Sequence, residues 1–329
     1  MWLSPSMMLM LISILSSIFL VASSPSLLIS WVGLELNTMA FLPILLSKKN
    51  KINSEASIKY FLTQVLASIL IILGACLLFL NIISLSKILI LFSLFIKLGA
   101  APFHSWILSI AESVEWGVLF LLLTIQKINP LILMWAFVTD ILWLIQGVII
   151  ISLVVGGVTG LVHTSSRQLI TFSSINHMGW LLMGMLLDLW VSVFYFFIYF
   201  LILLPVMVIL NFFGTSHINE IFLANLSNSK QLLLFSSLLS LGGLPPFLGF
   251  LPKWIVLQNV VAGGYYLISL VMILMSLITL FFYLRLSFSS FIMGGLKVVI
   301  KNSYTYPFNN FHMYFIAFSL SGLPVFFLV

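Results

Sequence analysis

The sequence predicts an all-α polytopic membrane protein, a single transmembrane domain over residues 1–329 that crosses the bilayer about eleven times. Three observations favour this fold class. Of the 329 residues, 62% are hydrophobic and only 6% are charged, whereas roughly a quarter of the residues in a soluble domain are charged. The apolar residues form runs of about 20, the length that a spanning helix needs. Two of these runs contain glycine and proline beside a lysine, which is typical of broken transporter helices.

Eleven apolar runs between polar or helix-breaking residues are the expected spans. They cover roughly residues 7–22, 26–46, 56–80, 87–108, 116–137, 140–162, 167–187, 189–212, 231–259, 262–284 and 311–329. The first run begins at Met7 without a basic leader, so we expect no removable signal or transit peptide. Because the number of spans is odd, the two termini should lie on opposite sides of the membrane.

The ninth run contains the stretch LGGLPPFLGFLPKW, residues 241–254. As one straight helix the run would be about 43 Å long, which exceeds a hydrocarbon core of about 30 Å. We therefore predict an unwound segment from Gly242 to Pro246. Backbone groups released inside hydrocarbon are tolerated only where protein or a water-filled cavity satisfies them, so the break indicates a polar interior.

The fourth run contains a similar pattern, KLGAAPFHSW at residues 97–106. Two breaks at corresponding places suggest an internal repeat of five helices over residues 1–137 and 138–284, followed by a C-terminal helix at 311–329. An odd number of helices per repeat makes the second copy inverted in the membrane, as in many secondary transporters.

Basic residues in the loops predict the orientation. The side that carries the N-terminus would hold Lys48, Lys49, Lys51, Arg167, Lys230, Arg285, Lys297 and Lys301. The other side holds little beyond Lys87. Because basic loops face the inner compartment, the N-terminus is expected there, and acidic residues such as Glu112 and Glu115 count little in this rule.

Five ionisable residues fall inside the predicted spans: Glu35, Lys97, Lys127, His177 and Lys253. Glu35 and Lys97 lie about 14 and 15 Å into their helices, close to the bilayer centre. An ionisable side chain at this depth is costly unless it meets a partner or water, which makes a functional role the default interpretation. A carboxylate close to a buried lysine favours its charged form, and burial disfavours it. A movable glutamate could therefore load and unload a lysine with a proton.

Structural roles remain open for the same residues. Glu35 could be a static partner of a lysine, and Lys253 beside Trp254 could be an interfacial anchor. His177 could complete a hydrogen-bond network with neighbouring polar residues, and Lys59 is expected to reach the membrane surface. The sequence sets out these alternatives without deciding between them.

Other features limit the chemistry of the chain. Cys76 is the only cysteine, which excludes disulfides within the chain and cysteine-ligated iron–sulfur clusters. Four of the histidines, His104, His163, His217 and His312, show no paired spacing for zinc. The net charge of +6 is scattered along loops, which indicates a membrane protein and no nucleic-acid partner.

Six stretches of the sequence resemble the antiporter-like membrane subunits of mitochondrial respiratory complex I, NADH:ubiquinone oxidoreductase, and among them the chain 2 family of animal type. They are WVGLELN at 31–37, EASIKYFLTQ at 55–64, KLGAAPFHSW at 97–106, QKINP at 126–130, FSSINHMGW at 172–180 and GGLPPFLGFLPKW at 242–254. The stretches follow family order and are spread over about the first four fifths of the chain. The tail beyond Arg285 shows no stretch that we can match.

The resemblance implies an antiporter-like fold with inverted five-helix repeats and a role in proton translocation. It implies a coupling glutamate at Glu35, half-channel lysines at Lys97 and Lys253, a connecting lysine at Lys127, and His177 in the hydrated axis between half-channels. The expected partners are other membrane-arm subunits, related antiporter-like subunits among them, and membrane lipids. The complex is expected to use FMN, iron–sulfur clusters, NADH and ubiquinone, none of them bound in this chain. The inner compartment would be the mitochondrial matrix, with the C-terminus facing the intermembrane space.

Two further function classes share part of this pattern. A free-standing cation/proton antiporter would have the same charged axis, but no additional aspartates within the spans offer a sodium site. If the chain were a structural scaffold without transport, neutralising Glu35 and Lys97 together would leave proton pumping intact. Purification alone or within a large assembly would separate the first of these classes from a complex subunit.

Overall fold

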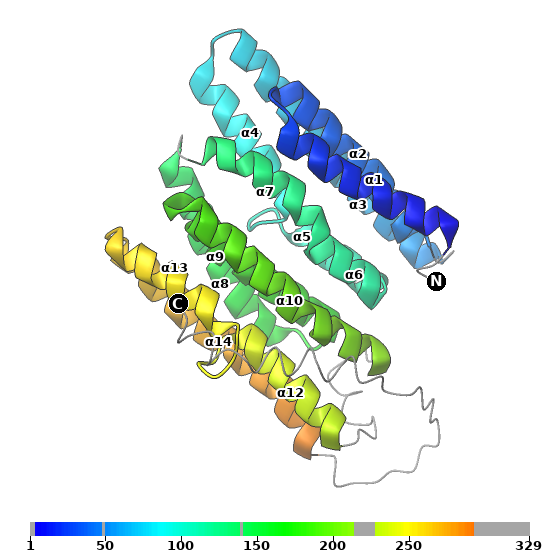
Figure 1. The fold of residues 1–329 in the computed structure, drawn as a ribbon, viewed down its shortest axis with the longest axis vertical. Helices are drawn as coiled ribbons and strands as arrows, with labels where there is room; N and C mark the ends of the chain where they lie inside the picture. The colour runs from blue at the N-terminus through cyan, green and yellow to red at the C-terminus, as the bar shows by residue number, and fades with distance from the viewer. Residues whose placement is uncertain (1–3, 48–49, 139–140, 214–227, 293–329) are drawn as a thin grey trace. The chain divides into compact units, whose positions relative to one another are not determined.

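The computed structural model describes residues 4–47, 50–138, 141–213 and 228–292, and all its regular elements there are α-helices (Figure 1). The helices are α1 Pro5–Ser23, α2 Leu27–Leu45, α3 Lys51–Phe79, α4 Ile83–Leu98, α5 Ser105–Ser113, α6 Trp116–Leu123, α7 Ile125–Phe137, α8 Leu142–Val162, α9 Ser166–Leu187, α10 Leu189–Phe213, α12 Asn228–Gly242, α13 Phe250–Ala262 and α14 Tyr266–Ile292. The all-α membrane fold class is confirmed.

These helices account for the first ten expected spans. Eight continuous helical stretches are long and apolar enough to cross a membrane, with α6 and α7 together forming one of them. The fourth and ninth spans are the two broken ones, α4 with α5 and α12 with α13. The eleventh, expected at 311–329, lies outside the described residues.

Both predicted helix breaks are present. The first runs from Gly99 to His104, and Gly99 takes a left-handed φ of 64° that ends α4. The second runs from Gly243 to Gly249, so it continues beyond the expected end at Pro246. Gly243 has a φ of 77°, a conformation that costs residues with a Cβ atom free energy and glycine almost none.

A third interruption, at Thr124 between α6 and α7, is not signalled by glycine or proline. Thr124 is fully buried and has φ −118° and ψ −79°. Its side-chain hydroxyl donates to the carbonyl of Phe120, an acceptor that its backbone N–H also uses. Side-chain bonds of this kind compete with the helical ladder and bend helices. The interruption places Lys127 in the first turn of α7.

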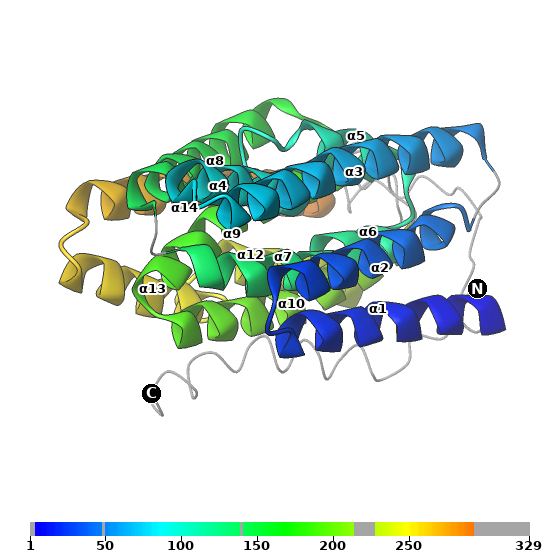
Figure 2. The same cartoon turned by 90° about the horizontal axis from the view of Figure 1, so that it is seen from above.

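The chain divides into two compact units, residues 1–152 and 153–329. In the first, α3 contacts α2, α4 and α5, while α7 contacts α1, α2, α4 and α6. Figure 2 shows α1 and α2 side by side within this unit. In the second, α9 contacts α10, α13 and α14, and α12 lies against α14. Each unit contains one broken span. The repeat over 1–137 and 138–284 remains a prediction.

Candidate functional site

Glu35 and Lys97 meet inside the first unit. Lys97 lies in the last turn of α4, directly before the first break, and its side chain is only 2% exposed. Its Nζ lies 3.9 Å from Oε1 of Glu35, which α2 contributes and whose side chain is 20% exposed. Neither atom has a hydrogen-bond partner within the described residues. The pair is therefore within Coulombic reach but too far apart for a direct hydrogen bond.

The second oxygen of the Glu35 carboxylate lies near the Thr38 hydroxyl, one turn further along α2. This hydroxyl has one hydrogen to donate, and its two acceptors are the Glu35 carbonyl at 2.8 Å and Oε2 at 3.4 Å. This leaves Oε1 as the oxygen directed at Lys97.

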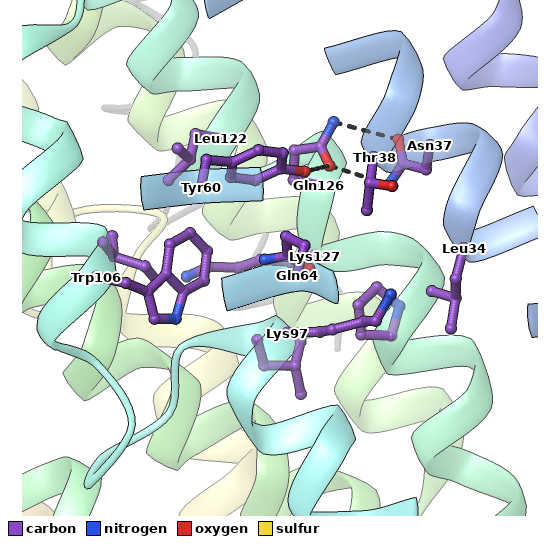
Figure 3. Close-up of a pocket in the computed structure, with 13 residues that line it drawn as sticks. Leu34, Asn37, Thr38, Tyr60, Gln64, Lys97, Trp106, Leu122, Gln126 and Lys127 are labelled. Carbon is purple, nitrogen blue, oxygen red and sulfur yellow. Dashed lines mark hydrogen bonds between the residues drawn. The ribbon is translucent and has the colours of Figure 1, made fainter. Parts of the chain in front are cut away.

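Lys97 and Lys127 line the same cavity of the first unit (Figure 3). Lys127 is 3% exposed and lies just after the Thr124 interruption. The cavity has room for about one water molecule. Its wall combines apolar side chains with polar ones: Asn37, Thr38, Tyr60, Gln64 and Gln126. The structure thus brings two of the predicted lysines to one small polar space.

Three helices are joined by hydrogen bonds beside this cavity. Asn37 of α2 and Gln126 of α7 exchange amide hydrogen bonds, with Nδ2 to Oε1 at 3.0 Å and Nε2 to Oδ1 at 3.2 Å. The Tyr60 hydroxyl of α3 donates to the same Gln126 oxygen at 3.1 Å. Figure 3 shows the Gln126 amide between Asn37 and Tyr60. This amide cluster, Asn37, Tyr60 and Gln126, ties the helix of Glu35 to that of Lys127.

Lys253 lies in the first turn of α13, directly after the second break. It is 5% exposed, and its Nζ donates a 2.8 Å hydrogen bond to the carbonyl of Gly242, the last residue of α12. The ammonium also lies 5.7 Å from the centroid of the Trp180 ring. Lys253 therefore points inward, and the neighbouring Trp254, 41% exposed, is the side chain that faces outward.

His177 lies in α9, the most buried of the long helices. Its Nδ1 is 2.7 Å from the Tyr195 hydroxyl of α10, and its ring centroid is 5.0 Å from that of Tyr199. His177 and both tyrosines line a second cavity, within the second unit. Lys253 is not among the lining residues, although Pro252 beside it is.

The sequence prediction missed the amide cluster, Trp180 and Tyr195. One signal was available for Asn37 and Gln126: amides inside an apolar span are expensive unless paired, and each lies within two residues of a predicted site residue. Tyrosine and tryptophan are common at membrane interfaces, so their presence in a span carries no comparable signal.

Comparisons with known proteins identify a matching family and similar sequences. Residues 24–279 match the family model described as NADH:quinone oxidoreductase/Mrp antiporter, transmembrane. NADH-ubiquinone oxidoreductase chain 2 of Anopheles gambiae is 41% identical over 95% of this chain and 94% of its own length. The corresponding chain of Aedes aegypti is 37% identical over 89% of both chains.

Solved structures share the fold at lower identity. A chain of respiratory complex I from Thermus thermophilus has a TM-score of 0.84 and 21% identity, over 96% of this chain and 78% of its own. A chain of the Mrp complex from Dietzia has a TM-score of 0.78 and 17% identity, over 84% of this chain and 59% of its own. The family match and the identity to the insect chains show that this chain belongs to the NADH-ubiquinone oxidoreductase chain 2 family, among the antiporter-like membrane proteins.

Proposed function

We propose that this chain is a proton-translocating subunit in the membrane arm of respiratory complex I. NADH oxidation and ubiquinone reduction take place in other subunits, and their free energy drives protons through this one. The observation that carries the proposal is the pair of Glu35 and Lys97, a carboxylate and an ammonium 3.9 Å apart, buried beside a helix break. Family membership indicates that the enzyme is NADH:ubiquinone reductase and that the partners of this chain are other membrane-arm subunits.

Moving the Glu35 carboxylate is the step that changes the charge of Lys97. With Oε1 near Nζ, the negative charge favours the ammonium. When the carboxylate turns away, the buried ammonium loses that compensation and releases its proton to a neighbouring acceptor. We assign the movement to the glutamate, because its side chain is 20% exposed whereas the Lys97 side chain is 2% exposed.

The proton released by Lys97 has a nearby acceptor in Lys127, which lines the same cavity. We assign Lys127 the connecting role and Lys253 the corresponding role to Lys97 in the second unit. His177, with Tyr195 at 2.7 Å, is assigned to the polar axis of that unit. No site for FMN, iron–sulfur clusters, NADH or ubiquinone is assigned to this chain, because the redox steps belong to its partners.

The membrane is proposed to be the mitochondrial inner membrane, since the relatives named above are animal chains of a respiratory enzyme. The basic loops support an N-terminus in the matrix and a C-terminus toward the intermembrane space.

Replacing Glu35 by glutamine tests the proposal in assembled complex. The amide keeps the size of the side chain and removes its charge, so Lys97 can no longer be loaded by the carboxylate. We expect a lower ratio of protons pumped to electrons transferred at equal complex abundance. Glu55→Gln is a matched control, because Glu55 forms a surface pair with Lys59 at 2.6 Å with both side chains about half exposed or more. Normal pumping in Glu35→Gln would contradict the proposal.

A further inference from the structure

The two lysines beside the helix breaks have different partners. Lys97 faces a carboxylate, that of Glu35. Lys253 forms no salt bridge within the described residues, and the groups near its ammonium are the Gly242 carbonyl and the Trp180 ring. Since Lys253 is 5% exposed, its charged form depends on these two neutral groups.

The Gly242 carbonyl is one of the acceptors that the end of α12 leaves without a helical partner. The last four carbonyls of a helix lack intrahelical donors and carry the negative end of the helix dipole. The break makes this end available inside the protein, and Lys253 Nζ reaches it at 2.8 Å. One side of the Lys253 ammonium is therefore stabilised by a hydrogen bond to this carbonyl.

The Trp180 ring lies near another side of the Lys253 ammonium. A cation within about 6 Å of an indole centroid is attracted by the ring, most strongly where water is excluded. Trp180 is 1% exposed and lies 5.7 Å from Nζ. It also stacks on Tyr195, with centroids 6.3 Å apart and an interplanar angle of 11°, and Tyr195 is in turn bonded to His177. The ring is therefore held in place by a tyrosine of the neighbouring helix α10.

The Trp180 Nε1 has no hydrogen-bond partner within the described residues. Buried tryptophans usually find one, so the N–H group does not explain an indole at this position. The ring face, which lies near the Lys253 ammonium, explains an indole at this position.

We propose that Trp180 is a positioning residue that stabilises protonated Lys253 in place of a carboxylate. The inference rests on the role assigned to Lys253 in the proposed function. It makes the two lysines different in kind: the charge of Lys97 depends on a group that can move, whereas that of Lys253 depends on a fixed carbonyl and a fixed ring.

The test is the pH profile of the proton-to-electron ratio in assembled complex carrying Trp180→Leu or Trp180→Phe. Leucine removes the π face, and phenylalanine keeps a weaker one. For Trp180→Leu we expect the alkaline limit of pumping to move to lower pH by about one unit, a roughly tenfold change in proton affinity. For Trp180→Phe we expect a smaller displacement in the same direction. Trp254→Leu, at an exposed tryptophan beside Lys253, should leave the profile unchanged.

Other titratable groups on the helices packed against α13 are Arg167 and His177 on α9, Tyr195 and Tyr199 on α10, and Tyr266, Tyr283 and Arg285 on α14. A displacement of the alkaline limb that the Trp180 variants show and Trp254→Leu does not show therefore reports on the contact between Trp180 and Lys253.

An unchanged profile in Trp180→Phe and Trp180→Leu would overturn the inference. If the leucine variant failed to assemble, the phenylalanine variant alone would decide. Lys253→Met separates this failure from failure of the proposed function: normal pumping in that variant would remove Lys253 itself from the path. Impaired pumping in Lys253→Met with unshifted tryptophan variants would leave the proposed function standing and reject only the role of Trp180.

Discussion

Lys253 donates to a backbone carbonyl inside the protein, and an arginine in its place would keep the positive charge. Arginine stays charged at any physiological pH, whereas a buried lysine can lose its proton. An interfacial anchor would accept either cation. Because the ammonium is directed at Gly242 inside the protein, we expect Lys253→Arg to lower the proton-to-electron ratio of assembled complex.

The control for this substitution is Lys59→Arg. The Lys59 side chain is 47% exposed and paired with Glu55, so it should tolerate arginine. Normal coupling in Lys253→Arg would favour the anchor alternative and remove Lys253 from the proton path.

Gln126 holds two partners, and its loss leaves both without their hydrogen bonds. In Gln126→Leu the Asn37 amide and the Tyr60 hydroxyl lose partners in a buried region. Interhelical hydrogen bonds of this kind contribute about 0.6–2 kcal/mol each. We expect a lower temperature of thermal inactivation for the complex. Gln258→Leu, at an exposed position of α13, should change it little, and equal temperatures for the two variants would contradict a stabilising role for the amide cluster.

The second helix break depends on Gly243 in two ways. Its φ of 77° disfavours a Cβ atom, and a Cβ there would lie 2.9 Å from Cδ and 3.1 Å from Nζ of Lys253. We expect Gly243→Ala to displace the lysine from the Gly242 carbonyl and to lower the proton-to-electron ratio.

Gly264 supplies a matched control for this element. It has a φ of 79°, but a Cβ there would meet no atom within 4 Å. Both alanine variants carry the same backbone strain of about 1 kcal/mol, and only the one at Gly243 presses on Lys253. Equal pumping in the two variants would show that the contact does not matter.

The two main breaks were predictable because their cause is local. The break within residues 241–254 was predicted from glycine and proline in an apolar run too long for the bilayer. The break within residues 97–106 was predicted from the same residue types. The interruption at Thr124 was not predictable, because a threonine in an apolar run more often stays helical. Its hydroxyl donates to the Phe120 carbonyl, and no pattern of residue types in the sequence marks this contact as an interruption.

At the scale of the whole molecule, the sequence predicted which residues carry charge into the membrane, but only one of the contacts that these residues make. The pairing of Glu35 with Lys97 follows from one acidic and one basic group at similar depth. The ring of Trp180 near Lys253, and the Tyr195 hydroxyl on His177, depend on how α9, α10 and α13 pack together. Such contacts between distant segments leave no periodic signal in a single sequence.

The predicted orientation of the chain in the membrane can be tested on α3, which separates two exposed positions near its ends. Lys51 is the first residue of this helix, and Ser84 follows the turn after its last residue, so the two lie on opposite sides if α3 spans the bilayer. The basic loops predict the matrix for Lys51. We expect Lys51→Cys, in a Cys76→Ser background that removes the exposed native thiol, to react with a membrane-impermeant thiol reagent only in inverted inner-membrane vesicles. Ser84→Cys should react only in vesicles of native orientation, and the opposite pattern would reverse the assigned topology.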